Sequence, residues 1–191
     1  YTIWSEVFTC PHCRAPVVFY EGAFDVATGS VRDSFACAGC GGLVRKTGVG
    51  ALQRRKETVR LLTGETTERT EFRPVRIHYR HQVDGKWFTG HKPVEPADRA
   101  TLARVSRLSV SGAPTYEFPH RHMTHERTTL VSSGFRQVES LYTDRALAAL
   151  TVLWRWASEE RDPDLRRALK FWVEQAFWGL SWMNRYRPDG F

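Results

Sequence analysis

The 191-residue sequence has only four cysteines and two methionines, and no apolar run in it is long enough to cross a membrane. No signal-peptide pattern opens the chain, which begins YTIW without a methionine. We therefore expect a segment cut from a longer polypeptide, cytoplasmic and without membrane contact. Glycine-rich cofactor loops are missing, as is any Ser/His/Asp or Cys/His pair with a catalytic spacing. We expect this segment to contain no catalytic residue.

Acidic residues are fewer than basic ones, 21 against 28, which gives a net charge of +7. Arginine accounts for 23 of the 28 basic residues, and its planar guanidinium group binds two phosphate oxygens at once. A basic surface favours an acidic partner such as DNA. The alternatives are that the charge serves solubility alone, and that the arginine content reflects a GC-rich genome.

The hydrophobic pattern divides the chain into three regions and predicts the α+β class. Residues 1–50 form short strands around two cysteine pairs, and residues 51–95 form antiparallel β-hairpins. Residues 96–191 contain a loop and helices, which we expect to pack with the first two regions as one unit. The strands predicted in the first region span residues 3–8, 17–20 and 31–35.

A β-hairpin is the clearest element of the second region. The alternating segment FRPVRIHYRHQV is followed by Asp84-Gly85, a pair that favours the positive φ angles of a two-residue turn, and then by KWF. Trp87 and Phe88 can stack on an exposed base, but such residues more often belong to a core. A short helix over residues 97–108 follows this region.

Two longer helices are expected near the C-terminal end. The first begins after Thr143, a good N-cap, and carries the apolar stripe Leu147, Leu150, Trp154 and Ala157. The second begins after Asp162, with Pro163 at its first position, and extends to Tyr186. Its two apolar faces are Leu165, Leu169, Trp172, Ala176, Leu180 and Met183, and Phe171, Trp178 and Trp182. A helix that is apolar on two faces needs two neighbours, so we expect contact with the rest of the polypeptide or self-association.

All four cysteines occur in two Cys-x-x-Cys pairs, Cys10 with Cys13 and Cys37 with Cys40. Two such turns facing each other place four thiolates around one zinc ion. Glycine follows the second pair, where the turn favours it, whereas Arg14 in the equivalent place fits less well. Disulfides and a redox-active pair are the alternatives. No secretory signal supports disulfides, and a redox pair needs no second copy.

Four thiolate ligands leave no open position on the metal, so we predict one structural zinc ion that does not activate water. This ion would close a strand-rich unit that lacks a sufficient core of its own. His12 lies between two ligands, but the ligand set is complete without it. The predicted architecture is a zinc ribbon plus a small antiparallel sheet, followed by a C-terminal helical hairpin.

Basic residues cluster after the second cysteine pair in RKTGVGALQRRKETVR, where Glu57 is the only acidic residue. Cations on such a scaffold suit contacts with DNA phosphates, and a solvated surface is the alternative. Arg145 is unfavourable for the dipole of the helix that it begins, which suggests a phosphate contact there too. The candidate nucleic-acid-binding residues are Arg45, Lys46, Arg54, Arg55, Lys56, Arg60 and Arg145.

Three histidines, His120, His122 and His125, lie within six residues in PHRHMTHE, next to Glu126. A histidine-rich tract can bind a second transition metal, and a metal-dependent nuclease would need one. The spacing matches neither a helical pair of ligands nor a familiar catalytic pattern. We expect a polar loop that reaches toward a partner.

Five segments carry a resemblance to a known protein family, and they occur in the family's order over nearly the whole chain. They are YTIWSEVFTCPHC, VRDSFACAGCGG, FPHRHM, GFRQVESLYTDRALAALTVLW and MNRYRP. They resemble a group of bacterial and archaeal DNA methyltransferases in which a zinc ribbon is inserted in an adenine-specific enzyme. The zinc-ribbon segments and the block Tyr142-Thr143-x-Arg145 are the most specific. The family often has FPTDRM where this chain has FPHRHM, so the histidines are particular to this protein.

The resemblance implies that the four cysteines bind zinc. It also implies a zinc-ribbon insertion of a site-specific, S-adenosylmethionine-dependent DNA (adenine-N6) methyltransferase that contacts DNA or the target site. The family's S-adenosylmethionine-binding motif and its Asp/Asn-Pro-Pro-Tyr/Phe catalytic tetrapeptide lie outside this segment, which therefore binds no S-adenosylmethionine itself. The alternative is a structural or assembly module of that enzyme without direct DNA contact.

Overall fold

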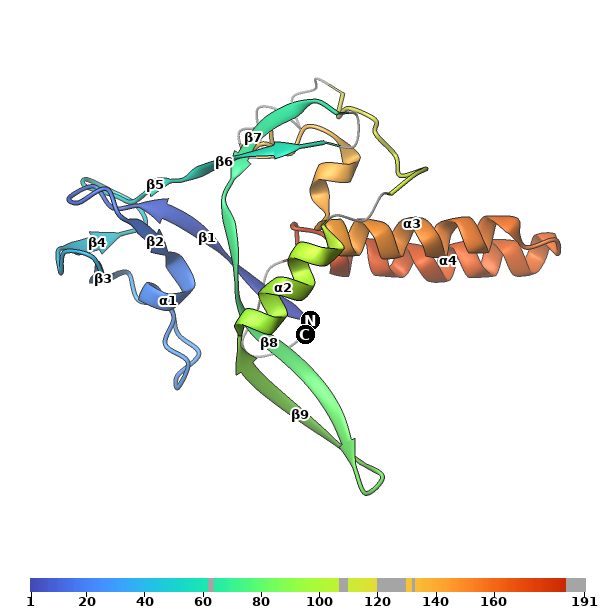
Figure 1. Cartoon of the computed structure of the whole chain (residues 1–191), viewed down its shortest axis with the longest axis horizontal. Coiled ribbons are helices and arrows are strands. Elements are labelled where there is room, and N and C mark those ends of the chain that lie inside the picture. The colour runs from blue at the N-terminus through green and yellow to red at the C-terminus, as the bar shows by residue number, and fades with distance from the viewer. Residues whose placement is uncertain (62–63, 107–109, 120–129, 132, 185–191) are drawn as a thin grey trace. The chain divides into compact units, whose positions relative to one another are not determined.

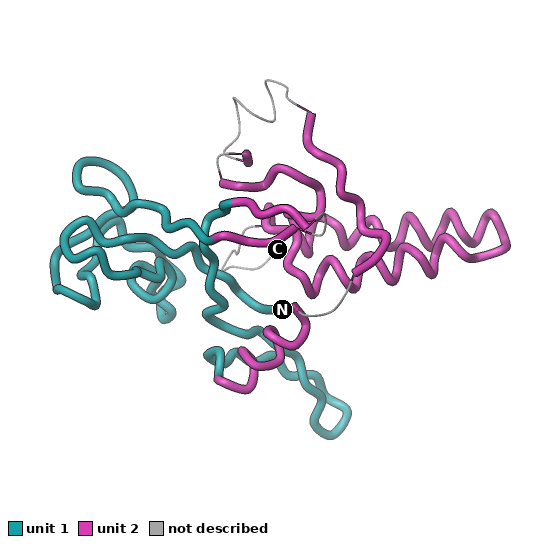
Figure 2. The backbone as a smooth tube through the Cα atoms, turned by 45° about the horizontal axis from the view of Figure 1, so that its top comes forward, with its two compact units in different colours: residues 1–57, 68–95, 186–191 teal, residues 58–67, 96–185 magenta. Residues whose placement is uncertain are grey.

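The computed structural model describes residues 1–61, 64–106, 110–119, 130–131 and 133–184 (Figure 1). The chain divides into two compact units, which Figure 2 shows in separate colours. The described part of unit 1 is Tyr1–Glu57 and Glu68–Glu95, and unit 2 contains Thr58–Thr67 and the described residues from Pro96 onward. Helices and antiparallel sheets are both present, so the predicted α+β class is confirmed.

Strand β1 (Thr2–Thr9) is the centre of the five-stranded antiparallel sheet of unit 1. Its first half pairs with β8 (Phe72–Val83), and its last residues pair with β2 (Pro16–Val18) and β5 (Gln53–Arg54). Strand β9 (Lys86–Pro93) pairs with the other edge of β8. The predicted regions 1–50 and 51–95 therefore share one sheet.

The core of unit 1 surrounds the two cysteine turns. Along β1 the side chains of Ile3, Ser5 and Val7 are buried, which is the period-2 alternation of a strand with one buried face. The core cluster contains Phe8, Cys10, Val17, Ala23, Phe35, Cys37, Val44 and Leu52. Two of the four predicted metal ligands are thus part of the hydrophobic core.

The strand predicted over residues 17–20 is shorter in the structure. It ends at Val18, where the short helix α1 (Phe19–Ala23) begins. The backbone N–H of Tyr20 donates to the side-chain Oγ of Ser5 at 2.9 Å instead of to a backbone carbonyl of β1. Pairing with β1 stops at Val18 for this reason.

Two further pairs of strands are antiparallel. The strand predicted over residues 31–35 is reduced to β3 (Ser34–Ala36), which pairs with β4 (Leu43–Arg45), while Val31 forms an isolated bridge with Phe24. Strands β6 (Lys56–Arg60) and β7 (Thr66–Thr70) form the other pair.

The predicted hairpin is confirmed. Strand β8 covers residues 72–83, and Asp84 and Gly85 have φ angles of 48° and 77°, as the Asp-Gly turn requires. Beyond His78, the described pairing of β8 is with β9 alone, and the two strands extend as a ribbon (Figure 1). Every residue from Tyr79 to Thr89 is exposed.

Unit 2 contains α2 (Pro96–Val105), the 3-10 helix η2 (Val138–Leu141) and the antiparallel pair α3 (Asp144–Glu159) and α4 (Pro163–Leu180). Both helices of the pair begin at the predicted N-caps: Thr143 accepts from the N–H of Ala146, and Asp162 accepts from two N–H groups of the next turn. The predicted α3 stripe is confirmed at Leu147, Leu150 and Ala157, which are buried.

The face of α4 that packs on α3 differs from the predicted stripe. Leu169, Val173, Ala176 and Phe177 form this contact, at the i, i+4, i+7, i+8 spacing of one helix face, whereas Trp172 is exposed. The helix also ends earlier than predicted, at Leu180, because Ser181 bridges to Tyr142 and the next N–H donates to the carbonyl of Leu141 at 2.8 Å. Tyr186 lies outside the described residues.

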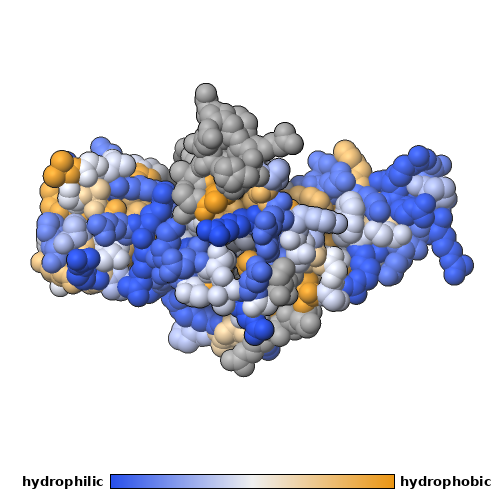
Figure 3. Space-filling model, turned by 90° about the horizontal axis from the view of Figure 1, so that it is seen from above, coloured by the Kyte–Doolittle hydropathy of each residue, from blue (hydrophilic) through white to orange (hydrophobic). Residues whose placement is uncertain are grey.

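Hydrophilic side chains cover much of the face drawn in Figure 3, with apolar residues in small groups between them. Among the described residues, no helix combines the length and the apolar composition that crossing a membrane requires.

Candidate functional site

The four cysteine sulfur atoms form one cluster in unit 1. One pair lies between β1 and β2, and the other lies between β3 and β4. The Sγ atoms of Cys10 and Cys40 are 3.9 Å apart, as are those of Cys13 and Cys37, and all four lie within 4.8 Å of one another. The structure thus brings together all four predicted metal ligands.

Two turns with the same hydrogen bonds hold these sulfurs. In each turn the residue after the second cysteine donates its N–H to the carbonyl of the first: Arg14 to Cys10 at 3.0 Å, and Gly41 to Cys37 at 2.8 Å. The N–H of the first cysteine donates, at 2.9 Å, to the carbonyl two residues after the second. These bonds direct both sulfurs of a pair to the same side of the turn.

The backbone strain of the two turns is unequal, as the sequence predicts. The residue after each pair has a positive φ, 63° at Arg14 and 72° at Gly41. Glycine adopts this conformation freely, whereas a side chain raises its energy by about 1–2 kcal/mol. The first turn is therefore the more dependent on contacts that hold it in place.

Glycine is also needed where the two turns approach each other. A Cβ added at Gly39 would lie 3.1 Å from the Cβ of Ala15, and one added at Gly42 would lie 3.0 Å from the ring of His12. The His12 ring thus packs on the second turn, and its Nε2 lies 3.3 Å from the carbonyl oxygen of Leu43.

Two of the sulfur–sulfur separations match those around a tetrahedral metal ion. With Zn–S bonds of about 2.3 Å, sulfurs at the corners of a tetrahedron are about 3.8 Å apart, close to the 3.9 Å separations observed. A disulfide requires about 2.05 Å, and all four cysteines are free thiols in this structure. The arrangement could hold a metal ion such as zinc.

The pKa values of two thiols shift in opposite directions. The backbone N–H of Cys13 points at the sulfur of Cys10 and lowers the pKa of the Cys10 thiol to about 6. The N–H of Ala15 acts in the same sense on Cys13, but burial and the neighbouring thiols outweigh it and raise the Cys13 pKa to about 11. A thiolate forms readily at Cys10, and a nearby cation would be needed to stabilise a second thiolate at Cys13.

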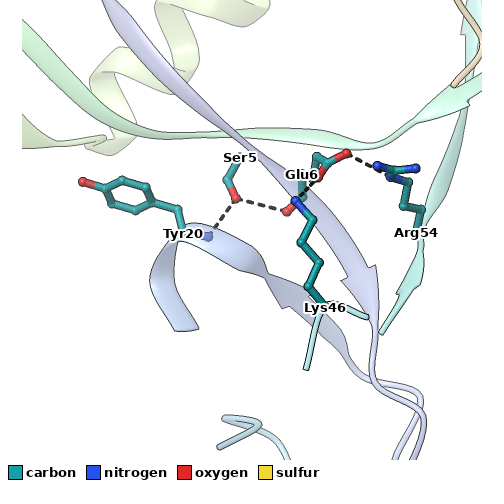
Figure 4. A network of polar contacts seen from close by, with 5 residues as sticks. All are labelled: Ser5, Glu6, Tyr20, Lys46 and Arg54. Atoms are coloured by element: carbon teal, nitrogen blue, oxygen red, sulfur yellow. Dashed lines mark hydrogen bonds and ion pairs between the residues drawn. The ribbon is translucent and has the colours of Figure 1, made fainter. Parts of the chain in front are cut away.

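Acidic side chains on β1 and between β7 and β8 partly neutralise the basic residues predicted to bind DNA. Glu6 on β1 pairs with Lys46 at 3.1 Å and with Arg54 at 3.0 Å (Figure 4). Arg55 pairs with Glu71 at 2.6 Å. Both glutamates lie outside the basic run in the sequence, so only the folding of the sheet reveals these pairs.

The other predicted basic residues are exposed and belong to both units. Arg45 and Lys56 are in unit 1, and Arg60 is in unit 2. Arg145 lies in the first turn of α3 in unit 2, where the sequence placed it. Of the seven predicted basic residues, the structure thus brings Lys46 and Arg54 together, because both pair with Glu6.

The predicted site residues do not include the β8–β9 ribbon, which carries a second group of basic and aromatic side chains. Trp87 is 61% exposed and Phe88 is 47% exposed, so their interpretation as core residues is wrong. The guanidinium carbon of Arg80 lies 5.0 Å from the centre of the Trp87 ring, and His81 stacks on Phe88. The available signal was the position of KWF directly after a two-residue turn, at the end of a hairpin rather than in its middle.

His120, His122, His125 and Glu126 lie outside the described residues. No protein-family model, curated protein or solved structure shows a significant match to the chain. The resemblance to DNA methyltransferases therefore stays a prediction.

Proposed function

We propose that this chain is a zinc-stabilised, DNA-contacting module of a site-specific, S-adenosylmethionine-dependent DNA (adenine-N6) methyltransferase. The observation that carries the proposal is the clustering of the sulfurs of Cys10, Cys13, Cys37 and Cys40 within 4.8 Å of one another. Both cysteine pairs occur in segments that resemble the methyltransferase family most specifically. S-adenosylmethionine supplies the methyl group in such enzymes, and we assign its binding site and the catalytic tetrapeptide to the remainder of the polypeptide.

Zinc is the metal that suits four thiolates in a tetrahedron. Because sulfur fills all four positions, the metal binds no water and its role is structural. Cys10 and Cys37 are core residues, so the ion would link the β1–β2 turn to the β3–β4 turn through the centre of unit 1. Zinc-bound thiolates rather than disulfides are typical of a reducing compartment, and we place the chain in the cytoplasm.

The net charge of +7 supports DNA as the partner. Lys46, Arg54 and Arg55 keep 42–44% of their side chains exposed in these ion pairs, so a phosphate can approach each cation from the solvent side. The ion pairs made by Lys46, Arg54 and Arg55 are therefore compatible with DNA contact.

Binding of the whole chain to a labelled DNA duplex, measured by fluorescence anisotropy across a salt series, tests the DNA contact. The logarithm of the affinity should fall with that of the salt concentration, with a slope of about −0.9 per phosphate contacted. The double variant Arg54→Ala/Arg55→Ala should make this slope less steep. The control Arg166→Ala/Arg167→Ala, which removes an adjacent pair of arginines on α4, should leave the slope unchanged. Absence of binding at low salt would contradict the proposal.

The parent enzyme is tested separately with the full polypeptide. We expect transfer of a labelled methyl group from S-adenosylmethionine to N6 of adenine in duplex DNA. Flanking sequence without a glycine-rich motif and without the catalytic tetrapeptide would contradict a methyltransferase parent.

The outer face of α4 favours a second candidate function, a structural or assembly module. Phe171, Trp172 and Trp178 are each more than 60% exposed, and large apolar side chains grouped on a surface are typical of protein interfaces. An assembly role predicts that Trp178→Ala weakens association with the remainder of the polypeptide, or with a second copy, in light scattering. The same variant should leave DNA affinity unchanged.

A further inference from the structure

We propose that the β8–β9 ribbon enters the major groove of duplex DNA, with Arg80 and Lys86 on the phosphates and Trp87 and Phe88 against the bases. This inference rests on the proposed DNA contact, but it assigns the contact to residues outside the basic run selected from the sequence. Its support comes from the length, the charge and the register of the ribbon.

The ribbon has the dimensions that the groove requires. Residues 79–83 of β8, which pair with β9 alone, extend about 17 Å at 3.3–3.4 Å per residue. The major groove is about 12 Å wide and 8.5 Å deep, and it admits a two-stranded β-ribbon. The tip can therefore reach the base edges while the other end of the ribbon remains in the sheet of unit 1.

The charge of the ribbon favours nucleic acid as the partner. Residues 72–93 contain five arginine or lysine side chains and a single acidic one, Asp84 in the turn. Arg73 and Lys92 form ion pairs at the base of the ribbon. Arg80 and Lys86, nearer the tip, have no acidic partner in the part of the chain that the structure describes.

The register places a cation and an exposed aromatic ring near the tip on each face of the ribbon. Directly paired residues share a face, and the face alternates along a strand. Arg80 pairs with Thr89, and Trp87 pairs with Gln82, so Arg80 and Trp87 lie on one face.

The opposite face has the matching pair. Lys86 pairs with Val83, and Phe88 pairs with His81. The groove is bounded by a phosphate backbone on each side, so a ribbon with a cation on both faces can contact both backbones at once. Contact with the bases would also remove two exposed aromatic rings from water.

Gly90 keeps the ribbon thin. It pairs with Tyr79, and a Cβ added at Gly90 would lie 2.6 Å from Cζ of that ring. The glycine therefore lets the tyrosine ring lie across the ribbon rather than project from it. A thin ribbon is the shape that a groove about 12 Å wide can accept.

Fluorescence anisotropy with the whole chain and a labelled duplex tests the proposal. Arg80→Ala/Lys86→Ala should reduce the magnitude of the salt slope by about 2, because each phosphate contact contributes about 0.9. The matched control, Arg99→Ala/Arg104→Ala, removes two exposed cations from α2 and should leave the slope unchanged. Trp87→Ala/Phe88→Ala should keep the slope but lower the affinity about 10-fold or more.

The outcomes separate this inference from the proposed function. All four substituted ribbon residues are exposed, so we expect every variant to fold. Metal content and a circular dichroism spectrum equal to those of the wild type check this. If the wild-type chain binds DNA and the ribbon variants bind equally well with the same slope, the ribbon assignment is wrong and the DNA contact stands. If the wild-type chain binds no duplex at low salt, both are wrong. Competition by netropsin, a minor-groove ligand, with none by methyl green, a major-groove ligand, would also overturn the ribbon assignment.

Discussion

Removal of the proposed zinc ion is expected to unfold the cysteine-bearing part of unit 1. The β3–β4 hairpin, which positions the second cysteine pair, has only three residues in each strand. An isolated two-stranded hairpin is marginally stable at best in water. Phe35 and Val44 tie this hairpin to the core, but Cys10 and Cys37 belong to the same cluster, so loss of the metal leaves thiols there in place of metal-bound sulfurs.

The magnitudes favour unfolding over a local adjustment. A structural zinc ion contributes about 10–16 kcal/mol at pH 7 in zinc-finger peptides. The whole free energy of unfolding of a typical domain is about 5–15 kcal/mol. Val44→Ala, which removes buried carbon atoms from the same core but no ligand, should cost only about 1.5–3 kcal/mol.

Hydrogen exchange followed by mass spectrometry is the appropriate assay because it reports on each segment separately. The purified chain should contain one zinc ion. After treatment with a strong chelator, amides of residues 34–45 should exchange freely, while those of α3 and α4 in unit 2 keep their protection. Cys37→Ser should reproduce this result without chelator, and Val44→Ala should retain the metal.

Two observations would refute this reasoning. One is the absence of bound metal from pure protein. The other is protection of residues 34–45 that survives both the chelator and the Cys37→Ser substitution. Thiol titration distinguishes the metal site from a pair of disulfides, because chelation exposes four reactive thiols in a metal site and none in disulfides.

Three further predictions concern stability. Thr143→Ala removes the N-cap of α3 and should lower the free energy of unfolding of unit 2 by about 0.5–2 kcal/mol in urea denaturation. Val173→Ala should cost about 1.5–3 kcal/mol, whereas Trp172→Ala should be nearly neutral; the reverse order would mean that the other face of α4 packs on α3. Burial, reinforced by nearby positive charge including that of His91, lowers the pKa of His78, so the unfolded chain binds the proton more readily than the folded one. Stability of unit 1 should therefore be level above about pH 6.5 and fall below it, and His78→Leu should reduce this loss; a pH profile identical to that of the wild type would contradict the assignment.

Local signals in the sequence determined several features of the protein correctly. The Asp84-Gly85 turn and the N-caps Thr143 and Asp162 depend on a few adjacent residues, whose backbone preferences and side-chain acceptors act over one turn of the chain. The cysteine spacing belongs to the same class, because each pair of sulfurs is oriented by hydrogen bonds within its own turn. Gly41 and Arg14 show that even the difference in strain between the two turns can be predicted locally.

Only the tertiary structure decided which distant groups meet. Glu6 reaches Arg54 because β1 pairs with β5, and Lys46, directly after β4, meets the same carboxylate; no local pattern contains these long-range contacts. The packed face of α4 depended on the partner that α3 offers, since two apolar stripes on one helix are equivalent until a neighbour covers one of them. Trp87 and Phe88 are exposed for the opposite reason: hydrophobicity predicts burial only where another layer of protein is available to cover the residue.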